Sequence, residues 1–305
     1  MSIHTDQSAP GVVSAIAVVG GGTMGVGIAY VYAAAGWTTW VVEPDETRAH
    51  AMLQTIAQTA ASGARRGKLT AEQAAQLPHA VQRVVSVAEL PMGLDLVVET
   101  VPERLALKQQ VLIGIEQRSP RVIASNTSAL SIDVLAGSLK DPGLFLGMHF
   151  FNPVWSLPMV ELVTGARTSP EALALARSFA EATGKTTIVS KDIPGFATSR
   201  LDVLSAMEAI RMLEDGVASA EDIDKAMTTA FRHPVGPLRL TDIVGLDVRL
   251  DIARYLSKAL GDRFAPPQLL QDKVARGELG VKSGRGFYDW SDSRFFDAQT
   301  ERTSA

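Results

Sequence analysis

Short apolar runs alternate with stretches of helical periodicity along the first two thirds of the chain. The runs are too short for helices, and several are rich in Val, as buried strands are. The stretches between them place apolar side chains on one helical face. The predicted strands cover residues 15–19, 37–42, 94–99, 122–125, 144–149, 159–163 and 186–189. Strands and helices in alternation predict a parallel, doubly wound sheet with helices on both faces.

Three of the intervening helices begin after residues that are suited to cap them. Asp45, Thr70 and Ser169 each carry a side-chain oxygen that accepts hydrogen bonds from the free N–H groups of a first helical turn. Gln73 completes a capping box with Thr70. The predicted helices cover residues 28–35, 46–64, a short segment after Thr70, 105–117, 132–136 and 170–182.

Strand signals end near Lys191, and only helical periodicity follows Pro194-Gly195. The helices predicted there cover residues 201–214, 220–229, 246–260 and 267–276. We therefore predict two domains, an α/β domain over residues 14–190 and an all-α domain over residues 191–292. Residues 1–13 and 293–305 are expected to be terminal tails.

A glycine-rich turn follows the first predicted strand. It reads Gly20-Gly21-Gly22-Thr23-Met24-Gly25, which fits G-x-G-x-x-G and leads into a helix and a second strand. Gly20 permits a tight turn, Gly22 leaves room for a pyrophosphate, and Gly25 lets the helix lie against the strand. Three glycines could also make an ordinary tight turn, but the order of elements predicts a Rossmann-type dinucleotide site. The residues expected to line it are Gly20, Gly22, Thr23, Met24 and Gly25.

Glu43 ends the second predicted strand about twenty residues after the glycines, where an acid binds the adenosine ribose in such folds. Its carboxylate would accept hydrogen bonds from both ribose hydroxyls and would repel a 2′-phosphate. The sequence therefore predicts NAD as the cofactor rather than NADP.

Composition narrows the class of protein further. A chain of 305 residues with 46% hydrophobic and 20% charged residues is typical of globular proteins. The net charge of −4 gives no overall field that would attract nucleic acid or an anionic membrane. The absence of cysteine excludes disulfides, thiolate metal sites and cysteine nucleophiles. We expect a cytoplasmic protein without a signal peptide, a membrane span or a metal.

Four polar segments follow predicted strands, and the carboxyl ends of parallel strands meet at one edge of a sheet, where ligands bind. These segments are the glycine turn, Glu99 to Glu103, Ser125 to Ser128, and His149 to Pro153. Their shared position predicts one site.

His149 ends the strand over residues 144–149, and the chain returns through the strand that contains Glu161. If these two strands pair, the carboxylate can reach the imidazole and fix its tautomer for acid/base work. On spacing alone, the more ordinary interpretation is a histidine bonded to a backbone carbonyl and a glutamate facing water.

The other polar residues at this edge also have ordinary interpretations. The segment Ser125-Asn126-Thr127-Ser128 could cap the helix that starts at Ile132. Glu103 and Lys108 could be solvated charges at the start of a helix.

Seven motifs occur in the order found in the L-3-hydroxyacyl-CoA dehydrogenase family. They are IAVVGGGTMGVGIA, VVETVPERLALK, ASNTSALSI, GMHFFNPVWSLPMVELV, KDIPGFATSRL, RHPVGPLRLTDIVGLD and GVKSGRGFYDW. The resemblance covers nearly all of residues 14–290 and is closest to the short bacterial 3-hydroxybutyryl-CoA dehydrogenases. It implies an NAD-dependent oxidoreductase that interconverts L-3-hydroxyacyl-CoA and 3-ketoacyl-CoA.

The resemblance also implies roles for individual residues. His149 matches the family's catalytic base and Glu161 its partner, while Ser128 matches the serine that hydrogen-bonds the reacting oxygen. Asn152 matches an asparagine beside the nicotinamide. The positions that match cofactor contacts are Glu43, Glu103, Lys108, Ser128, Asn152 and Lys282. The basic residues Arg65, Arg66 and Lys68 match a helix end that meets coenzyme A phosphates, although a solvated helix end would look the same.

The chain departs from the family pattern after the Pro-Gly-Phe motif. The family usually has an asparagine that reaches the substrate, whereas this chain has Ser199, which offers one hydroxyl in place of an amide. Ser199 could act through a bridging water or mark a bulkier substrate. Trp155 also adds bulk to an otherwise matching loop.

Two alternatives stay open at this point. One is a related dehydrogenase for a non-CoA hydroxy acid or a carrier-protein thioester, and the other is a catalytically idle NAD-binding protein of the lens-crystallin kind. The resemblance further implies that the helical domain shapes the substrate pocket and supplies the contact of a homodimer.

Overall fold

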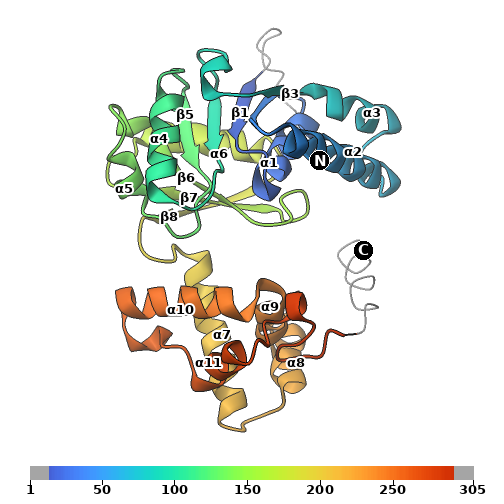
Figure 1. Ribbon diagram of the computed structural model, residues 1–305, viewed down its shortest axis with the longest axis vertical. Helices are drawn as coiled ribbons and strands as arrows, with labels where there is room; N and C mark the ends of the chain where they lie inside the picture. Colours follow the sequence, from blue (N-terminus) through green and yellow to red (C-terminus); the bar gives the residue numbers. More distant parts are fainter. Residues whose placement is uncertain (1–13, 292–305) are drawn as a thin grey trace, which may run out of the picture. The chain divides into compact units, whose positions relative to one another are not determined.

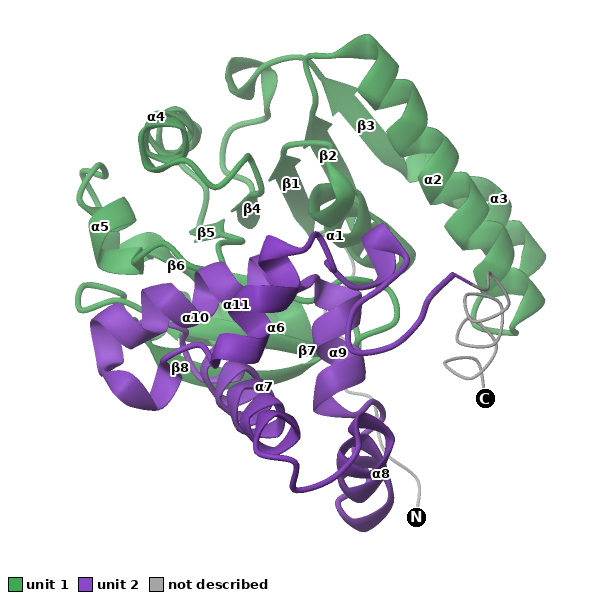
Figure 2. Cartoon of the chain, turned by 60° about the horizontal axis from the view of Figure 1, so that its bottom comes forward, with its two compact units in different colours: residues 1–192 green, residues 193–305 purple. Residues whose placement is uncertain are grey.

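The computed structural model describes residues 14–291, so both predicted tails lie outside the described residues. The chain divides into two compact units, residues 1–192 and residues 193–305 (Figure 2). Each unit has its own cluster of buried apolar side chains.

Unit 1 is built on one sheet of eight strands in the order β3-β2-β1-β4-β5-β6-β7-β8 (Figure 1). The strands are β1 (Ala15–Val19), β2 (Thr38–Val42), β3 (Val81–Val84), β4 (Leu96–Glu99), β5 (Val122–Ser125), β6 (Phe145–Phe150), β7 (Met159–Thr164) and β8 (Thr186–Lys191). All neighbours run parallel except β6 and β7. That pair is antiparallel because only a short loop joins the two strands, whereas a parallel pair needs a long crossover.

The helices of unit 1 cover both faces of the sheet. They are α1 (Thr23–Ala34), α2 (Glu46–Arg65), α3 (Ala71–Ala80), α4 (Leu105–Glu116), α5 (Ile132–Ala136) and α6 (Pro170–Glu181). Successive strand residues point to opposite faces. Leu146 and Met148 belong to one apolar cluster with residues of α1 and α6. Gly147 faces the other way, since a Cβ there would lie 2.9 Å from Ile132 of α5.

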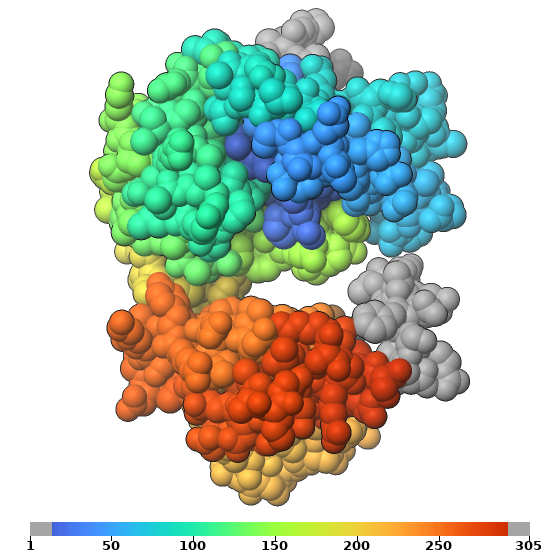
Figure 3. All heavy atoms as spheres, viewed as in Figure 1, coloured from blue at the N-terminus to red at the C-terminus, as the bar shows by residue number. Residues whose placement is uncertain are grey.

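Local caps fix several helix starts as the sequence predicts. The Asp45 side chain accepts from the N–H of Arg48, and Thr70 and Gln73 form the predicted capping box. Helices α2 and α3 then lie side by side at one edge of unit 1, where they are blue and cyan in the space-filling view (Figure 3).

Unit 2 is helical over its described residues. Its helices are α7 (Thr198–Glu214), α8 (Ala220–Ala230), α9 (Pro237–Val244), α10 (Leu246–Leu260) and α11 (Gln268–Ala275). Its apolar cluster includes Leu250 and Phe264. A Rossmann-like sheet followed by a helical region confirms the predicted fold class. No helix within residues 14–291 is long and apolar enough to cross a membrane.

Two elements differ from the prediction. Strand β3 was not predicted, because its four residues include the polar pair Gln82 and Arg83 and it pairs only with β2, at the edge of the sheet. Helix α9 was not predicted either, because its first turn is capped by the distant Asp224. That carboxylate accepts hydrogen bonds from the N–H groups of Leu238 and Arg239.

Candidate active site

His149 and Glu161 lie directly opposite each other on β6 and β7. Opposed residues on neighbouring strands share a face of the sheet, and Nδ1 of the imidazole lies 3.1 Å from Oε2 of Glu161. Glu161 is fully buried and His149 is 7% exposed, while the ring of Phe151 packs 4.4 Å from the imidazole, centroid to centroid. The carboxylate therefore faces the imidazole, and the interpretation of a glutamate facing water is wrong.

The loop after β5, residues 126–130, lies beside the same strand end, and we call it the Ser128 loop. Asn126 Oδ1 accepts a hydrogen bond of 2.9 Å from the N–H of Phe150, the residue after His149. The exposed Ser128 lies two residues further along the loop. Helix α5 is capped by Ser131, which accepts from the N–H of Val134. The interpretation of residues 125–128 as the cap of this helix is therefore wrong.

Lys108 is buried and paired, so it is not a solvated charge at a helix start, whereas its partner Glu103 is exposed. Lys108 has no exposed surface, and its Nζ lies 2.9 Å from Glu99 Oε1 and 3.3 Å from Glu103 Oε2. Glu99 was not predicted to have a role of its own. Its position at the end of an apolar strand, like that of Glu43, was the sequence feature that could have indicated one. Burial raises the pKa of Glu99 above its usual value, although Lys108 and the Ser125 hydroxyl act to lower it.

The glycine turn has the backbone shape that G-x-G-x-x-G requires. Gly20 has a φ of +114°, in the region that favours glycine, and a Cβ on Gly25 would lie 1.8 Å from the Gly20 carbonyl oxygen. Gly22 is the N-cap of α1, and no side chain caps the first N–H groups of this helix. A Cβ on Gly22 would have no protein atom within 4 Å. The turn therefore leaves open space beside the N-terminus of α1, where a phosphate group could bind, with Thr23 and Met24 in the first helical turn.

The carboxylate of Glu43 at the end of β2 is held in a fixed position and is 3% exposed. Its oxygens accept hydrogen bonds from the N–H groups of Gly21 and Asp45 and from the Arg48 guanidinium, with distances of 2.9 to 3.2 Å. Burial alone would raise the pKa of Glu43, but these hydrogen bonds lower it below the usual glutamate value. The group is therefore ionised at neutral pH.

The loop between β6 and β7 carries Asn152, which is exposed, and Trp155, which is partly buried. Trp155 packs edge-on against Tyr30 of α1, with ring centroids 6.1 Å apart. The buried Lys185 donates hydrogen bonds of 2.6 and 2.7 Å to the carbonyls of Val154 and Leu157. No sequence signal pointed to Lys185, because it comes from a distant part of the chain.

The remaining predicted site residues lie apart from this cluster or on unit 2. Arg65, Arg66 and Lys68 are all exposed, where α2 ends and the chain turns towards α3. On unit 2, Ser199 lies in the first turn of α7, and Lys282 pairs with Asp247. No cluster of three or more acidic or histidine side chains within the described range could hold a metal ion.

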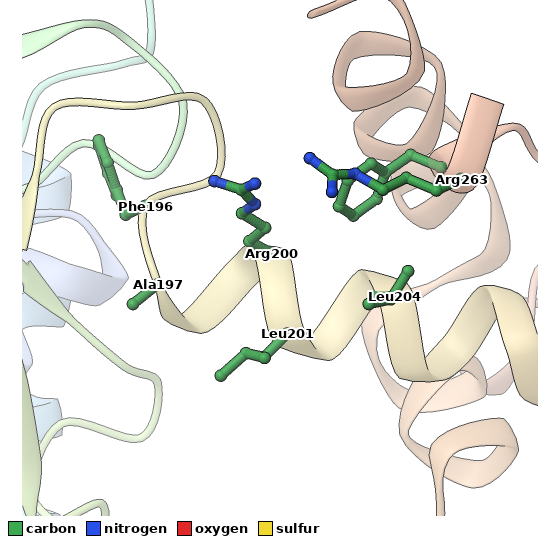
Figure 4. Close-up of a pocket in the computed structure, with 7 residues that line it drawn as sticks. Phe196, Ala197, Arg200, Leu201, Leu204 and Arg263 are labelled. Carbon is green, nitrogen blue, oxygen red and sulfur yellow. The ribbon is translucent and has the colours of Figure 1, made fainter. Parts of the chain in front are cut away.

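Unit 2 also has a cavity of about 400 Å³ between α7 and the short helix η3 (Asp262–Phe264). Figure 4 shows Arg200 and Arg263 reaching towards this space from the two elements. Ser199 is not among the residues that line it, although its neighbours Ala197 and Arg200 are.

Comparison with known proteins identifies relatives over nearly the whole described range. Residues 15–193 match the NAD binding domain of 3-hydroxyacyl-CoA dehydrogenase, and residues 195–290 match the C-terminal domain of 3-hydroxyacyl-CoA dehydrogenase. A probable 3-hydroxybutyryl-CoA dehydrogenase of Bacillus subtilis is 36% identical over 280 residues, which cover 91% of this chain and 97% of the relative. A 3-hydroxybutyryl-CoA dehydrogenase of Mycobacterium tuberculosis is 38% identical, with 90% and 98% covered.

Solved structures agree with these matches. The (S)-3-hydroxybutyryl-CoA dehydrogenase of Ralstonia eutropha superposes with a TM-score of 0.86 at 34% identity, over 92% of this chain and 100% of that one. FadB2 of Mycobacterium tuberculosis superposes with a TM-score of 0.84 at 38% identity, over 91% and 99% of the two chains.

Proposed function

We infer the reaction from one premise: the chain belongs to the 3-hydroxyacyl-CoA dehydrogenase family, because both domain models of that family match it. It is therefore an NAD-dependent oxidoreductase. We propose that it interconverts an L-3-hydroxyacyl-CoA and the 3-ketoacyl-CoA, with a short acyl group of the 3-hydroxybutyryl kind. The single observation that carries this proposal is the buried contact between His149 and Glu161 at the carboxyl edge of the sheet.

His149 acts as the acid/base in this proposal. An ionised Glu161 can only accept a hydrogen bond, so the proton of the neutral imidazole lies on Nδ1 and the lone pair on Nε2. In the oxidative direction Nε2 takes the proton of the 3-hydroxyl group, and the Glu161 carboxylate stabilises the imidazolium that forms. In the reductive direction the same nitrogen returns the proton to the oxygen. The Ser128 hydroxyl donates a hydrogen bond to that oxygen.

The residues that would hold the cofactor are distributed along the edge of the sheet. The glycine turn and the N-terminus of α1 bind the pyrophosphate, and Glu43 binds the adenosine ribose. Glu103, Ser128 and Asn152 are further contacts from unit 1, and Lys282 is one from unit 2. Lys108 is fully buried, so it acts through Glu103. When bound, NAD supplies the acceptor for the hydride that leaves carbon 3 of the hydroxyacyl substrate.

Substrate binding and assembly complete the proposal. Arg65, Arg66 and Lys68 bind the phosphates of coenzyme A, because exposed cations at a helix end can pair with them. Ser199 contacts the acyl thioester. The helical domain forms a homodimer, since unit 2 exposes large apolar side chains. Leu201, Val217 and Phe231 are 70%, 64% and 69% exposed.

The experiment follows the oxidation of NADH by the purified chain with acetoacetyl-CoA, with free acetoacetate, and with a longer or aromatic 3-ketoacyl-CoA. We expect turnover of acetoacetyl-CoA and none of free acetoacetate. Preference for the bulkier thioester would keep the reaction and change the acyl group, with Ser199 and Trp155 as the residues to test. Binding of NADH without turnover of any thioester would contradict the proposal.

A further inference from the structure

A network of ionic and hydrogen-bonded groups connects the end of β4 to the Ser128 loop. Its first member is Glu99, which is fully buried and uses both carboxylate oxygens. Oε1 accepts from the N–H of Val101 at 2.6 Å, and Oε2 accepts from the hydroxyl of Ser125 at 2.6 Å. Lys108 donates to both oxygens, at 2.9 and 3.0 Å. Glu99 therefore fixes the ammonium group of Lys108 against the ends of β4 and β5.

The second step leads from Lys108 to Glu103. The same ammonium group lies 3.3 Å from Oε2 of Glu103, whose side chain is 38% exposed. The other oxygen of Glu103 accepts a hydrogen bond from the Thr127 hydroxyl and from the N–H groups of Ser128 and Ala129, at 3.3 and 3.2 Å. Glu103 thus holds the backbone of Ser128 while Lys108 holds Glu103.

The loop is also held from its other side. The amide of Asn126 accepts from the N–H of Phe150, directly after His149. The Ser128 loop is therefore fixed between the strand that carries His149 and the group Glu99, Lys108 and Glu103, which we call the ionic triad. Networks of this kind are rigid when every member is satisfied.

We propose that the ionic triad sets the position of Ser128 relative to His149, so that Glu99 and Lys108 are positioning residues for the reaction. They act through Glu103 on the loop backbone and touch no reacting atom. This inference rests on the proposed function, since Ser128 is the group proposed to hydrogen-bond the reacting oxygen. The reaction requires Ser128 and His149 to reach the same oxygen atom, so the distance between the Ser128 loop and strand β6 is critical.

The test removes both charges of the buried pair at once, in the variant Glu99→Gln/Lys108→Met. Replacing both members avoids an unpaired buried charge, which would destabilise the fold. We expect the amides of Ser128 and Ala129 to exchange with deuterated water about tenfold faster or more. We also expect kcat for the 3-ketoacyl-CoA to fall about tenfold or more, with much smaller changes in KM.

A matched control uses an ion pair before the same two strands. Arg121 Nη1 lies 3.0 Å from Asp95 Oδ1, and these residues directly precede β5 and β4. Arg121→Met breaks that link at the opposite edge of the sheet, and it should change neither the exchange of the two amides nor kcat. If the triad variant does not fold, Glu103→Gln tests the last link by the exchange of the Ser128 and Ala129 amides, since kcat of this variant would also reflect the proposed cofactor contact of Glu103.

A second comparison separates positioning from a general loss of structure. In a Ser128→Ala background the triad substitutions should slow turnover by no more than about twofold, because the group they position is already absent. The inference would be overturned if the triad substitutions lowered kcat by the same factor with and without Ser128→Ala. It would also be overturned if the amides of Ser128 and Ala129 in the triad variant exchanged at the rate of the unsubstituted chain. A chain without turnover of any 3-ketoacyl-CoA would instead refute the proposed function, and amide exchange would still decide whether the triad fixes the loop.

Discussion

The two units use buried carboxylates for different purposes. In unit 1, Glu99 and Glu161 face the side chains Lys108 and His149 at the carboxyl edge of the parallel strands. In unit 2, Asp224 and Asp242 are buried as well, but they accept hydrogen bonds mainly from backbone N–H groups and aromatic side chains.

Asp242 shows the second use clearly. It accepts from the N–H groups of Phe287 and Tyr288 and from the indole of Trp290, at 2.7 to 2.9 Å. Burial raises the pKa of Asp242 in spite of these bonds. The difference teaches that burial of a charge does not by itself mark an active site. The hydrogen-bond partner of the carboxylate determines its use. A carboxylate that binds several N–H groups fixes the backbone, whereas one that binds an imidazole can assist proton transfer.

The largest effect should follow from a change in unit 1. His149→Gln removes the proposed base and should reduce kcat by about 10²- to 10⁴-fold, the usual contribution of general acid–base catalysis. NADH affinity and thermal unfolding should stay close to those of the unsubstituted chain. Glu161→Gln, which keeps the imidazole, should cost less. Full turnover by the His149 variant, or loss of NADH binding, would refute the assigned role.

The converse change is in unit 2. Asp242→Ala leaves three donors without their acceptor, each at a cost of about 1 to 3 kcal/mol, so we expect a loss of about 3 kcal/mol or more in the free energy of unfolding. Urea unfolding measures this loss, and kcat well below the transition should change little. Asp242→Asn, which keeps the volume and one acceptor oxygen, should lose less. Normal stability of the Asp242→Ala variant together with a loss of turnover would contradict the difference between the two units.

Ser199 tests whether unit 2 also contributes to the chemistry. If its short hydroxyl leaves a substrate carbonyl short of a donor, the deficit is about 1 to 3 kcal/mol, and Ser199→Asn should raise kcat/KM for acetoacetyl-CoA by about ten- to a hundredfold. Steady-state kinetics with acetoacetyl-CoA and a bulkier thioester measure the effect. A fall in kcat/KM for both substrates would show that the serine is adapted to this site.

The smallest effect concerns a surface cluster of unit 2. Hydrogen bonds from Arg276 and Lys273 lower the pKa of Glu278 to about 2. The unfolded chain, with a glutamate pKa of about 4.3, therefore binds more protons than the folded chain between these two values. The stabilisation by Glu278 is present above about pH 4.3 and is lost as the pH falls towards 2.

Glu278→Gln should therefore flatten the pH dependence of unfolding in this range, by about 1 kcal/mol or less, because its partner Arg276 is exposed and ion pairs near solvent contribute little. Denaturant unfolding at several pH values provides the measurement. If the free energy of unfolding of Glu278→Gln changed with pH as steeply as that of the unsubstituted chain, other carboxyl groups would determine this pH dependence.

Local signals made most of the fold predictable. The glycine turn, the capping box of Thr70 and Gln73, and the apolar strands depend on neighbours in the sequence, so their patterns are visible in the chain. Helix α9 was not predicted because the residue that caps it, Asp224, is distant in the sequence. Strand β3 was not predicted because its composition is not typical of a strand and it forms one by pairing with β2.

Part of the geometry of the candidate site was also visible in the sequence. The sequence placed the four polar segments at one edge, but the contact between His149 and Glu161 depended on the register of β6 and β7. The contacts of Glu99 with Ser125 and of Lys185 with Val154 were not predictable, because these partners are distant in sequence and only packing brings them together. Resemblance to a family supplied the reaction, which no spacing of residues alone could give.

The pairing of Glu99 with Lys108 also restricts how this chain can change over generations. Replacement of Lys108 alone leaves the buried Glu99 without its counterion, a loss of about 3 to 5 kcal/mol that many folded domains could not tolerate, whereas replacement of Glu99 alone leaves Lys108 paired with Glu103. Both replaced together by neutral residues of similar volume would keep the fold. A lineage that neutralised Lys108 is therefore expected to neutralise Glu99 as well, so that the two positions vary together among descendants of this sequence.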